Sequence, residues 1–437
     1  MPDSNSDSSP GHHPPADLFD KPLASPFLRA VHATPVRPYY RPLQARDGEA
    51  VVDGRKVVMA GCNDYLGLAT DPRVTAAAAT ALQTYGTSCS GARTLNGTLP
   101  LHGELEAAVA DFLGTEDAAV VTTGFQANLA LAALFGPGDA VFSDAANHAS
   151  LIDGIRLGAA DRLRYRHADP GHLDRLLAAA DPAAAKAVVT DGMFSMDGAL
   201  APLPALTAAA RRHGARTLVD GAHDIGLLGP TGRGAAELLG VHEQVDLFTG
   251  TFSKCFGSTG GFLAGPARVI THLRYAARAI LFSASMPPPA LAAAMSALEI
   301  SIDEPWRRHR VLALAARLRT RLTALGYATG PAHADPAPPG APPPPGPVIA
   351  VRTGDPADCV RLWQHLLDAG VYTNPVGPPA VPEGSSIIRV TLQATHTDTH
   401  VDHIAEAFAS ARRTPPPAVP APLPARSPQA LAPETAR

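Results

Sequence analysis

Through the middle of the chain, short apolar runs alternate with longer runs in which apolar residues recur at helical spacing. Short apolar runs are typical of buried parallel strands, and the longer runs are typical of helices that cover such a sheet. The runs predict strands over Ala118–Thr123, Ala140–Ser143, Arg162–Arg166, Ala187–Thr190, Thr217–Val219, Leu247–Thr251 and Gly261–Ala264. They predict helices over Asp71–Thr84, Leu101–Leu113, Phe125–Leu134, Leu203–His213 and Pro266–Ile280. This alternation favours an α/β fold with a mostly parallel, doubly wound sheet.

A different order of elements follows the prolines at 287–289. The pattern there predicts helices over 290–301 and 305–325, a strand over Val348–Val351, a helix over Pro356–Ala369 and a strand over Ile387–Val390. We expect these elements to form a smaller C-terminal α+β domain over 296–412, beside a large domain over 61–295 that an N-terminal arm over 26–60 precedes. The proline-rich stretch 331–347 is typical of an inserted loop, and residues 1–25 and 413–437 are expected to be disordered tails.

Composition and charge narrow the class of protein. The chain has 437 residues and a formal net charge of −4, so it offers no overall positive field for nucleic acid. No apolar run reaches the roughly 18 residues that a membrane span needs, and the N-terminus lacks the order of a secretory signal. The four cysteines show no CxxC spacing, which disfavours a disulfide framework or a structural zinc site. We therefore expect a cytoplasmic protein without a metal site, a nucleic-acid partner or a transmembrane segment.

Unusual polar residues follow five of the predicted strands, close to the point where each strand ends. They are Gly124-Phe125, Asn147-His148, Asp191 to Ser195, Asp220 with His223, and Lys254. In open α/β sheets, ligands bind beyond the carboxyl ends of the strands. One such coincidence would be weak, whereas five at one edge of a sheet indicate a site.

Lys254 is unusual because the chain uses arginine for almost all of its positive charge. Only four of the 36 basic residues are lysine, and Lys254 lies in the small-residue segment FTGTFSKCFGSTGG at 248–261. A lysine that is desolvated in such a segment has a lowered pKa and becomes an amine nucleophile. For this residue alone, a lysine that reaches out of a glycine-rich loop into solvent is an equally good interpretation. A phosphate loop is disfavoured because the GxxxxGK(S/T) pattern is absent.

Asp220 ends an apolar strand, where a buried carboxylate needs a positive partner. The protonated pyridine nitrogen of pyridoxal 5'-phosphate is such a partner, and the same cofactor also requires a lysine amine. His223 could reach the phenolic oxygen of that ring, Gly124-Phe125 could offer helix N–H groups to its phosphate, and His148 could stack on it. Taken singly, these residues also fit a helix cap, a surface histidine, an ordinary loop and a structural histidine.

Taken together, the sequence resembles the α-oxoamine synthases, a group of fold-type I pyridoxal-phosphate enzymes that includes serine palmitoyltransferase, 8-amino-7-oxononanoate synthase, 5-aminolevulinate synthase and 2-amino-3-ketobutyrate ligase. The resemblance extends from about Gly61 to Thr395 and implies the fold-type I architecture. It is carried in order, and at the family's spacing, by NDYLGL at 63–68, GARTLNG at 91–97, TGFQAN at 123–128, HAS at 148–150, FSMDG at 194–198, VDGAH at 219–223, GTFSK at 250–254 and SASMPP at 283–288.

The resemblance implies a role for each catalytic candidate. Lys254 would hold the cofactor covalently and then act as acid and base at the substrate α-carbon. Asp220 would pair with the pyridinium nitrogen and keep the ring an electron sink. His223 would contact the phenolic oxygen, and His148 would stack on the pyridine face.

The resemblance also implies the remaining contacts. Gly124, Phe125 and Thr251 would help to hold the phosphate, with Ser283 or Ser285 reaching it from the second subunit of a homodimer. Two further residues would lie against the ring and the amino-acid substrate, namely Ser195 and Asn63.

The activity so implied is a decarboxylating condensation of a small amino acid (serine, alanine or glycine) with an acyl thioester, which gives a 2-amino ketone. The segments 93–98, 124–129 and 362–372 are most similar to the bacterial serine palmitoyltransferase branch. In that branch an arginine binds the substrate carboxylate where this chain has Gly377, so Arg389 is the remaining candidate. A second departure is Asp191, which stands where glutamate is usual.

These departures leave several alternatives open. The thioester carrier could be coenzyme A or an acyl carrier protein, and 8-amino-7-oxononanoate synthase activity or a role in a specialised pathway stays possible. A silent partner subunit of a synthase is another class of function, which the presence of Lys254 disfavours. An aminotransferase or aldolase would use the same cofactor without releasing carbon dioxide when a thioester is added.

Overall fold

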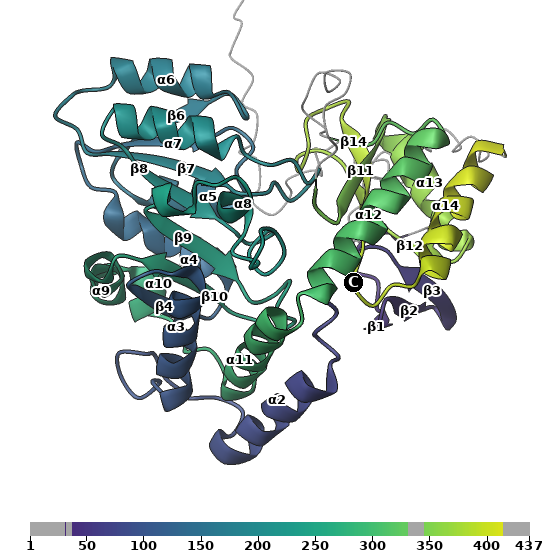
Figure 1. The fold of residues 1–437 in the computed structure, drawn as a ribbon, viewed down its shortest axis with the longest axis horizontal. Coiled ribbons are helices and arrows are strands. Elements are labelled where there is room, and N and C mark those ends of the chain that lie inside the picture. Colours follow the sequence, from purple (N-terminus) through teal and green to yellow (C-terminus); the bar gives the residue numbers. More distant parts are fainter. Residues whose placement is uncertain (1–30, 32–36, 331–344, 414–437) are drawn as a thin grey trace, which may run out of the picture.

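Figure 1 shows the computed structural model of the protein, which describes residues 31, 37–330 and 345–413. A larger body holds the central sheet and its helices, and a smaller body holds the C-terminal helices. Most of the proline-rich stretch 331–347 and the expected tails, apart from Arg413, lie outside the described residues. Arg413 is the last residue of a helix and not the first of a tail.

The seven strands expected in the middle of the chain form one sheet. Its order is β4-β10-β9-β8-β7-β5-β6, in which β10 runs antiparallel to both neighbours and the other neighbouring pairs are parallel. The mostly parallel sheet is therefore confirmed. The strands are β4 (Asp117–Val121), β5 (Ala140–Asp144), β6 (Asp161–Tyr165), β7 (Lys186–Asp191), β8 (Arg216–Asp220), β9 (Leu247–Thr251) and β10 (Gly261–Gly265).

Helices bury both faces of this sheet, as the continuous apolar runs of its strands require. Neighbouring residues of a strand belong to different cores: Val120 packs into the core on one face and Val121 into the core on the other. The first face is covered by α3 (Pro100–Leu113), α6 (Pro170–Ala179), α7 (Leu203–Arg212), α8 (Ala235–Leu238) and α11 (Pro288–Asp303). The second is covered by α4 (Gly124–Ala130), the 3-10 helix η1 (Leu131–Leu134), α5 (Ala149–Leu157), α9 (Ala267–Ala276) and α10 (Arg278–Leu281).

Two helices differ from their expected bounds. The helix expected over Pro266–Ile280 is two helices, because Ala277 adopts an extended conformation with φ −75° and ψ 111°. No glycine or proline marks this break, which allows Leu273, Ala277 and Ile280 to be buried in the same core. The helix expected over Phe125–Leu134 tightens into η1 after Ala130.

The C-terminal domain has its own small sheet, in the order β11-β14-β13, with antiparallel pairing throughout. Trp363 is fully buried at its centre and donates from Nε1 to the carbonyl of Thr373 at 3.0 Å. The strands are β11 (Val348–Gly354), β13 (Asn374–Val376) and β14 (Ser386–Thr391), and the helices are α12 (Trp306–Ala324), α13 (Pro356–Asp368) and α14 (Asp398–Arg413).

A third sheet, absent from the sequence analysis, joins the start of the described chain to this domain. Its order is β1 (Gln44–Arg46), β2 (Glu49–Val52), β3 (Arg55–Met59) and β12 (Val371–Tyr372), and β12 pairs with β3 in parallel. The first two strands turn at Asp47-Gly48 and the next two at Asp53-Gly54, and all four turn residues have positive φ. Asp-Gly between apolar runs is a strong hairpin signal, so the sequence did contain this information.

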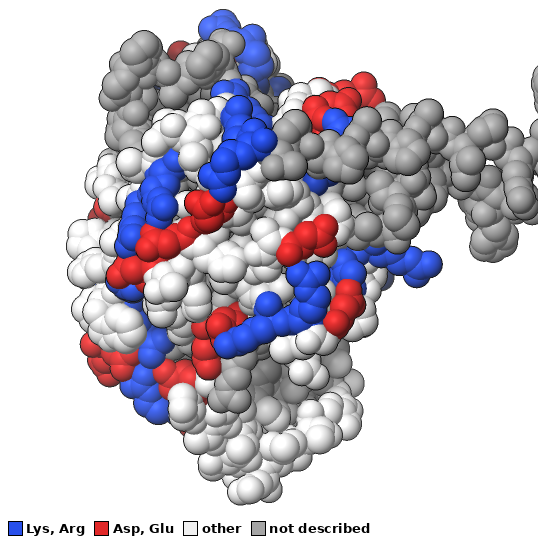
Figure 2. Space-filling view, turned by 90° about the vertical axis from the view of Figure 1, so that its right-hand side faces the viewer, with Lys and Arg blue, Asp and Glu red and all other residues white. Residues whose placement is uncertain are grey.

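Charges of both signs are interspersed on the side of the molecule that carries the C-terminal domain (Figure 2). Arg317, for example, lies between Asp398 and Asp402 of α14, at 2.8 and 2.6 Å. Among the helices of the described residues, none combines the length and apolar character that crossing a membrane requires. The described residues also include no group of three His, Cys, Asp or Glu side chains that could hold a metal ion.

Candidate active site

The polar residues that follow the strands line one cavity at the carboxyl ends of β4, β5, β7, β8 and β9. Its volume is about 250 Å³. Its lining includes seven of the residues expected from the sequence, namely Gly124, Phe125, His148, Asp220, His223, Thr251 and Lys254. It also includes Asp191, one of the residues noted at the strand ends, and six others, Thr123, Asn128, Ser150, Ala222, Gly250 and Ser253.

Lys254 lies three residues beyond the end of β9, in a turn whose neighbours Cys255 and Phe256 are buried. Burial lowers the pKa of its ammonium group, while Asp220 and Asp191 nearby oppose that shift. The net lowering increases the fraction of the neutral amine, which is the nucleophilic form.

Asp220 is the last residue of β8 and is buried at the floor of the cavity. One carboxylate oxygen accepts the backbone N–H of Ala222 at 2.8 Å, and the other accepts Nδ2 of Asn128 at 2.6 Å. Asn128 is itself oriented by Thr249, whose hydroxyl donates to Oδ1 at 2.8 Å. The carboxylate therefore has a fixed direction before any ligand binds.

His148 caps the N-terminus of α5, and its Nδ1 lies 2.7 Å from the hydroxyl of Ser150. That hydroxyl also accepts Nδ2 of Asn128 at 2.8 Å, so one asparagine connects His148 to Asp220. Burial lowers the pKa of the His148 imidazole, which favours the neutral ring.

Three buried carboxyl groups lie close together here, but two of them resist ionisation. Asp191 is paired in register with Asp220 on the neighbouring strand, and burial and the charge of Asp220 raise its pKa well above the ordinary value. Asp224 is enclosed near Gly192 and Gly234, and burial, followed by Asp220, raises its pKa to about 7. Both shifts make these two carboxyls keep a proton to higher pH than in water, which limits the negative charge buried in this part of the site.

His223 connects the cavity to the C-terminal domain. Its Nδ1 lies 2.8 Å from the hydroxyl of Tyr65, and burial lowers its pKa well below the ordinary value. The Tyr65 hydroxyl also accepts from Arg389 at 3.4 Å, and Nη1 and Nη2 of Arg389 each donate to Oδ1 of Asn63 at 3.1 Å. Nε of Arg389 donates to the carbonyl of Ser195 at 2.7 Å, which brings the two expected residues Asn63 and Ser195 to the same guanidinium.

At the other end of the cavity, the first turn of α4 faces Thr251. Thr123 caps this helix by accepting the N–H of Gln126 at 3.1 Å. A Cβ atom on Gly124 would lie 2.8 Å from Cβ of Thr251, so only glycine allows this close approach. The Thr251 hydroxyl donates a hydrogen bond to the carbonyl of Gly260 at 2.9 Å and lies 2.8 Å from the hydroxyl of Ser253.

Ser283 and Ser285 lie beside the cavity and do not line it within one chain. The hydroxyl of Ser283 accepts Nε2 of Gln126 at 2.6 Å, and that of Ser285 donates to the carbonyl of Gly91 at 2.9 Å. Their expected role across a subunit boundary stays a prediction.

The sequence analysis did not identify Asn128 and Tyr65 as site residues, although they belong to the motifs TGFQAN at 123–128 and NDYLGL at 63–68. Asn128 lies one helical turn beyond Gly124 and points back to Asp220, a position that i, i+4 spacing on α4 could have suggested. The contact between Tyr65 and His223 joins residues far apart in the chain, and no local pattern indicates it.

The chain is similar to known proteins in sequence and in fold. The sequence profile of the aminotransferase class I and II family matches residues 55–408. The chain is 40% identical over 397 residues to a serine palmitoyltransferase of Caulobacter vibrioides, which covers 90% of this chain and 95% of that protein. It is 42% identical over 395 residues to an 8-amino-7-oxononanoate synthase of Anaeromyxobacter dehalogenans, covering 90% and 96%. It also resembles the solved structure of a serine palmitoyltransferase variant from S. paucimobilis with bound pyridoxal phosphate and myriocin, with a TM-score of 0.82 and 36% identity over 86% of this chain and 93% of that one.

Proposed function

Because the chain belongs to the aminotransferase class I and II family and, within it, to the pyridoxal-phosphate-dependent α-oxoamine synthases, we propose that it condenses a small amino acid with an acyl thioester. The amino acid is serine, alanine or glycine. A bond forms between its α-carbon and the thioester carbonyl, the thiol leaves, the carboxylate departs as carbon dioxide, and a 2-amino ketone is released. The observation that carries the proposal is a single cavity that combines Lys254, Asp220 and His223.

The donor set of the cavity fits pyridoxal 5'-phosphate. When bound, this cofactor supplies an electron sink for the charge that develops on the substrate α-carbon. Lys254 offers the amine for covalent attachment, Asp220 offers the carboxylate for a pyridinium nitrogen, and the first turn of α4 with Thr251 offers donors for a phosphate. His148, with its ring kept neutral by burial, lines the same cavity and offers a flat face.

Lys254 moves the proton at the substrate α-carbon in this proposal. Its lowered pKa allows the neutral amine to accept that proton. A base of this kind must be desolvated to act near neutral pH, and the buried neighbours of Lys254 provide that environment.

His223 donates a hydrogen bond in this proposal, and Tyr65 selects the tautomer that can do so. Burial keeps the imidazole neutral and raises the pKa of the Tyr65 phenol to about 12, so the phenol keeps its proton. A Tyr65 hydroxyl that donates to Nδ1 leaves the ring proton on Nε2, from which His223 can donate into the cavity.

Arg389 binds the carboxylate of the amino acid. It is buried on β14, and Asn63 and the Ser195 carbonyl fix the direction of its guanidinium. A planar guanidinium can bind a carboxylate through two parallel hydrogen bonds, and here the carboxylate would replace Asn63 Oδ1 as the acceptor from Nη1 and Nη2. Because Gly377 has no side chain, the arginine on β14 carries this role without help from that position.

A homodimer covers the open side of the site. Large apolar side chains are exposed around the segment that carries Ser283: Leu95, Tyr275 and Phe282 are 81%, 76% and 77% exposed, and Phe125 at the cavity is 44% exposed. Exposed apolar groups at this density mark a protein interface. A second copy on this face would bury them and bring its Ser283 or Ser285 toward the phosphate end of the cavity.

The test is product formation by the purified chain loaded with pyridoxal 5'-phosphate. Serine, alanine and glycine are each combined with an acyl coenzyme A and with the same acyl group on an acyl carrier protein, and the 2-amino ketone is identified by mass. Carbon dioxide release should require both substrates. Amino-group transfer to a keto acid, or carbon dioxide release without thioester, would contradict the proposal.

The same combinations of amino acid and thioester distinguish the activities of the two relatives. Identities of 40% and 42% to a serine palmitoyltransferase and an 8-amino-7-oxononanoate synthase are nearly equal. Turnover of serine with a long acyl chain would favour the first activity, and turnover of alanine with an acyl group that ends in a carboxylate would favour the second.

A further inference from the structure

We propose that Arg307 is a positioning residue for the amino-acid side of the site. It acts through residues 63–69, named here the bridge segment, which carries Asn63 to Arg389 and Tyr65 to His223. Arg307 is not among the residues that line the cavity. The proposal rests on the proposed function, because an amino acid is the ligand that this side of the site would hold.

Arg307 contacts the backbone of the bridge segment. The residue is in the first turn of α12 and is 8% exposed. Its Nη1 donates to the carbonyl oxygens of Leu66 at 3.0 Å and Gly67 at 3.5 Å. Because both acceptors belong to the main chain, the arginine fixes the path of the segment and not the rotamer of one side chain.

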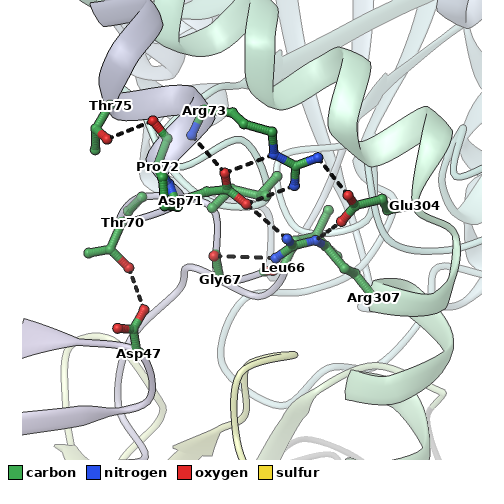
Figure 3. Close-up of polar contacts among 12 residues, drawn as sticks. Asp47, Leu66, Gly67, Thr70, Asp71, Pro72, Arg73, Thr75, Glu304 and Arg307 are labelled. Carbon is green, nitrogen blue, oxygen red and sulfur yellow. Dashed lines mark hydrogen bonds and ion pairs between the residues drawn. The ribbon is translucent and has the colours of Figure 1, made fainter. Parts of the chain in front are cut away.

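A closed cluster of charges holds the guanidinium in place (Figure 3). Nε of Arg307 donates to Glu304 at 2.7 Å, and Nη2 donates to Asp71 at 2.9 Å. Arg73 binds the same two carboxylates, at 2.6 and 2.9 Å. Its hydrogen bonds lower the pKa of both carboxyls, so the cluster stays ionised over the working range of pH. Each side chain is restrained by two partners, which makes the arrangement stiff.

The bridge segment is itself a tight unit. The carboxylate of Asp64 accepts the N–H groups of Leu68 at 2.9 Å and Ala69 at 3.1 Å. Gly67 has a φ of +66°, and a Cβ atom there would lie 2.4 Å from Cγ2 of Thr395. A shift at Leu66 and Gly67 is therefore transmitted along the segment to its other end.

The other end of the bridge segment contacts Arg389, the residue proposed to bind the substrate carboxylate. Oδ1 of Asn63 accepts both terminal nitrogens of Arg389, and the Tyr65 hydroxyl lies 3.3 Å from the same oxygen. If the segment relaxes, Arg389 loses the contact that orients it. We therefore expect amino-acid binding to weaken, while cofactor binding on the sheet side is preserved.

Arg307 stands near the junction between α11, which packs on the central sheet, and α12 of the smaller body (Figure 1). Arg307 lies in the first turn of α12, shortly after α11 ends. Its partner Glu304 is the residue that caps the C-terminus of α11. The cluster thus ties the junction of α11 and α12 to the start of α2 (Pro72–Tyr85), which Asp71 caps.

The experiment uses Arg307→Gln, Arg307→Lys and the matched control Arg308→Gln in the full chain loaded with cofactor. Arg308 is the next residue and is 3% exposed, but it donates to the carbonyls of Ser301 and Pro230 and not to the bridge segment. Two kinds of measurement are made. The first is hydrogen exchange of the amides in 63–69, and the second is steady-state kinetics, which gives kcat and the KM values for the amino acid and for the thioester.

Arg307→Gln should speed exchange in 63–69 and raise the amino-acid KM roughly tenfold, since small displacements of positioning groups have effects of this order or larger. It should leave the thioester KM within about twofold. Arg307→Lys should restore part of both changes because it keeps the charge. Arg308→Gln should change neither, although its melting temperature should fall too.

Exchange in 63–69 that is the same in Arg307→Gln and the wild type would overturn the proposal, whatever the activity. Faster exchange with an unchanged amino-acid KM would overturn it as well. A wild-type protein that binds no amino acid would instead refute the proposed function, and the exchange result would still decide whether Arg307 holds the segment. If Arg307→Gln does not fold, Asp71→Asn keeps a helix cap, removes one partner of Arg307 and should give smaller changes in the same direction.

Discussion

The two sides of the site are built in different ways. The sheet wall lines the cavity, and the opposite wall, which holds Arg389 and Asn63, lies beyond its lining and is joined to it through His223. On the sheet wall, Asp220 and the residues that orient it come from neighbouring parallel strands and the helix that follows β4, so the backbone ladder fixes their spacing.

On the opposite wall, Arg389 comes from β14 and Asn63 from the bridge segment, and side-chain hydrogen bonds join these two residues. Single backbone hydrogen bonds, such as that from Ala394 to the carbonyl of Tyr65 at 2.8 Å, hold the two segments together in place of a continuous ladder. In the proposed reaction, the first wall serves the cofactor and the second serves the amino acid.

The difference has a functional meaning. Groups that drive electron flow must be held rigidly, because misplacement at the reacting centre has a large effect on rate. Groups that select a substrate can be supported by contacts between domains, which tolerate change more easily. Variation among relatives with different amino-acid substrates is therefore expected on the second wall. Gly377, where the family resemblance implies a carboxylate-binding arginine, lies next to β13 in the domain that provides Arg389.

The largest effect is expected from Lys254→Ala, which removes the amine from the sheet wall. Product formation should fall by roughly 10²–10⁴-fold or more, since both covalent attachment and proton transfer are lost. The visible absorbance of the bound cofactor should change as well. Lys186→Ala is the matched control, because that lysine lies at the opposite, amino end of β7. Equal activity of Lys254→Ala and wild type would refute the assignment of this wall.

A smaller loss is expected from Asp220→Asn, which keeps the shape of the side chain and removes its charge. We expect kcat to fall on the order of 10²-fold, because charge stabilisation in the transition state is lost, with little change in the amino-acid KM. Steady-state kinetics of carbon dioxide release measure both. Asp224→Asn is the control, since it removes a second buried carboxyl that does not line the cavity.

Arg389→Ala tests the opposite wall. It should raise the amino-acid KM strongly, with a loss on the order of 2–5 kcal/mol for a carboxylate left without its partner. Arg389→Lys should recover only part of this loss because it cannot form two parallel hydrogen bonds. An unchanged KM in Arg389→Ala would show that another group binds the carboxylate.

The smallest effect concerns the stability of the fold and not activity. It comes from Asp224, a buried carboxyl that does not line the cavity. Its folded-state pKa of about 7 exceeds the ordinary value of 3.8, so between these pH values the folded chain keeps a proton that the unfolded chain has released. The stabilising contribution is therefore complete below pH 3.8 and is lost as pH rises through 7. The wild-type melting temperature should fall from pH 5 to pH 8 by more than that of Asp224→Asn. Parallel curves for the two proteins would contradict the raised pKa.

The sequence predicted the sheet wall better than the opposite wall. All seven central strands were found, most of them from short apolar runs, although β6 is the mixed segment DRLRY. Lys254, Asp220 and His223 follow strand ends, where ligands gather. The burial of Asp224 was not foreseen, because its enclosure near Gly192 and Gly234 depends on tertiary packing that a local pattern does not contain.

Most of the opposite wall depends on pairs of residues that are distant in the chain. Asn63 and Arg389 were proposed only through the family resemblance, and their contacts with Tyr65 join two segments that no periodicity relates. The hairpins at Asp47-Gly48 and Asp53-Gly54 were a different kind of miss, because the turn signal was present and was not used.

The pairing of β3 with β12 has a consequence for how the protein is made. Val58 and Met59 can pair with Val371 and Tyr372 only after the whole central sheet, which lies between them in the sequence, has been translated. Until β12 has been synthesised, the edge of β3 that it covers is unpaired and can associate with other nascent chains. Ribosome-bound chains stopped before β12 should therefore depend on chaperones, and chains that extend past it should not.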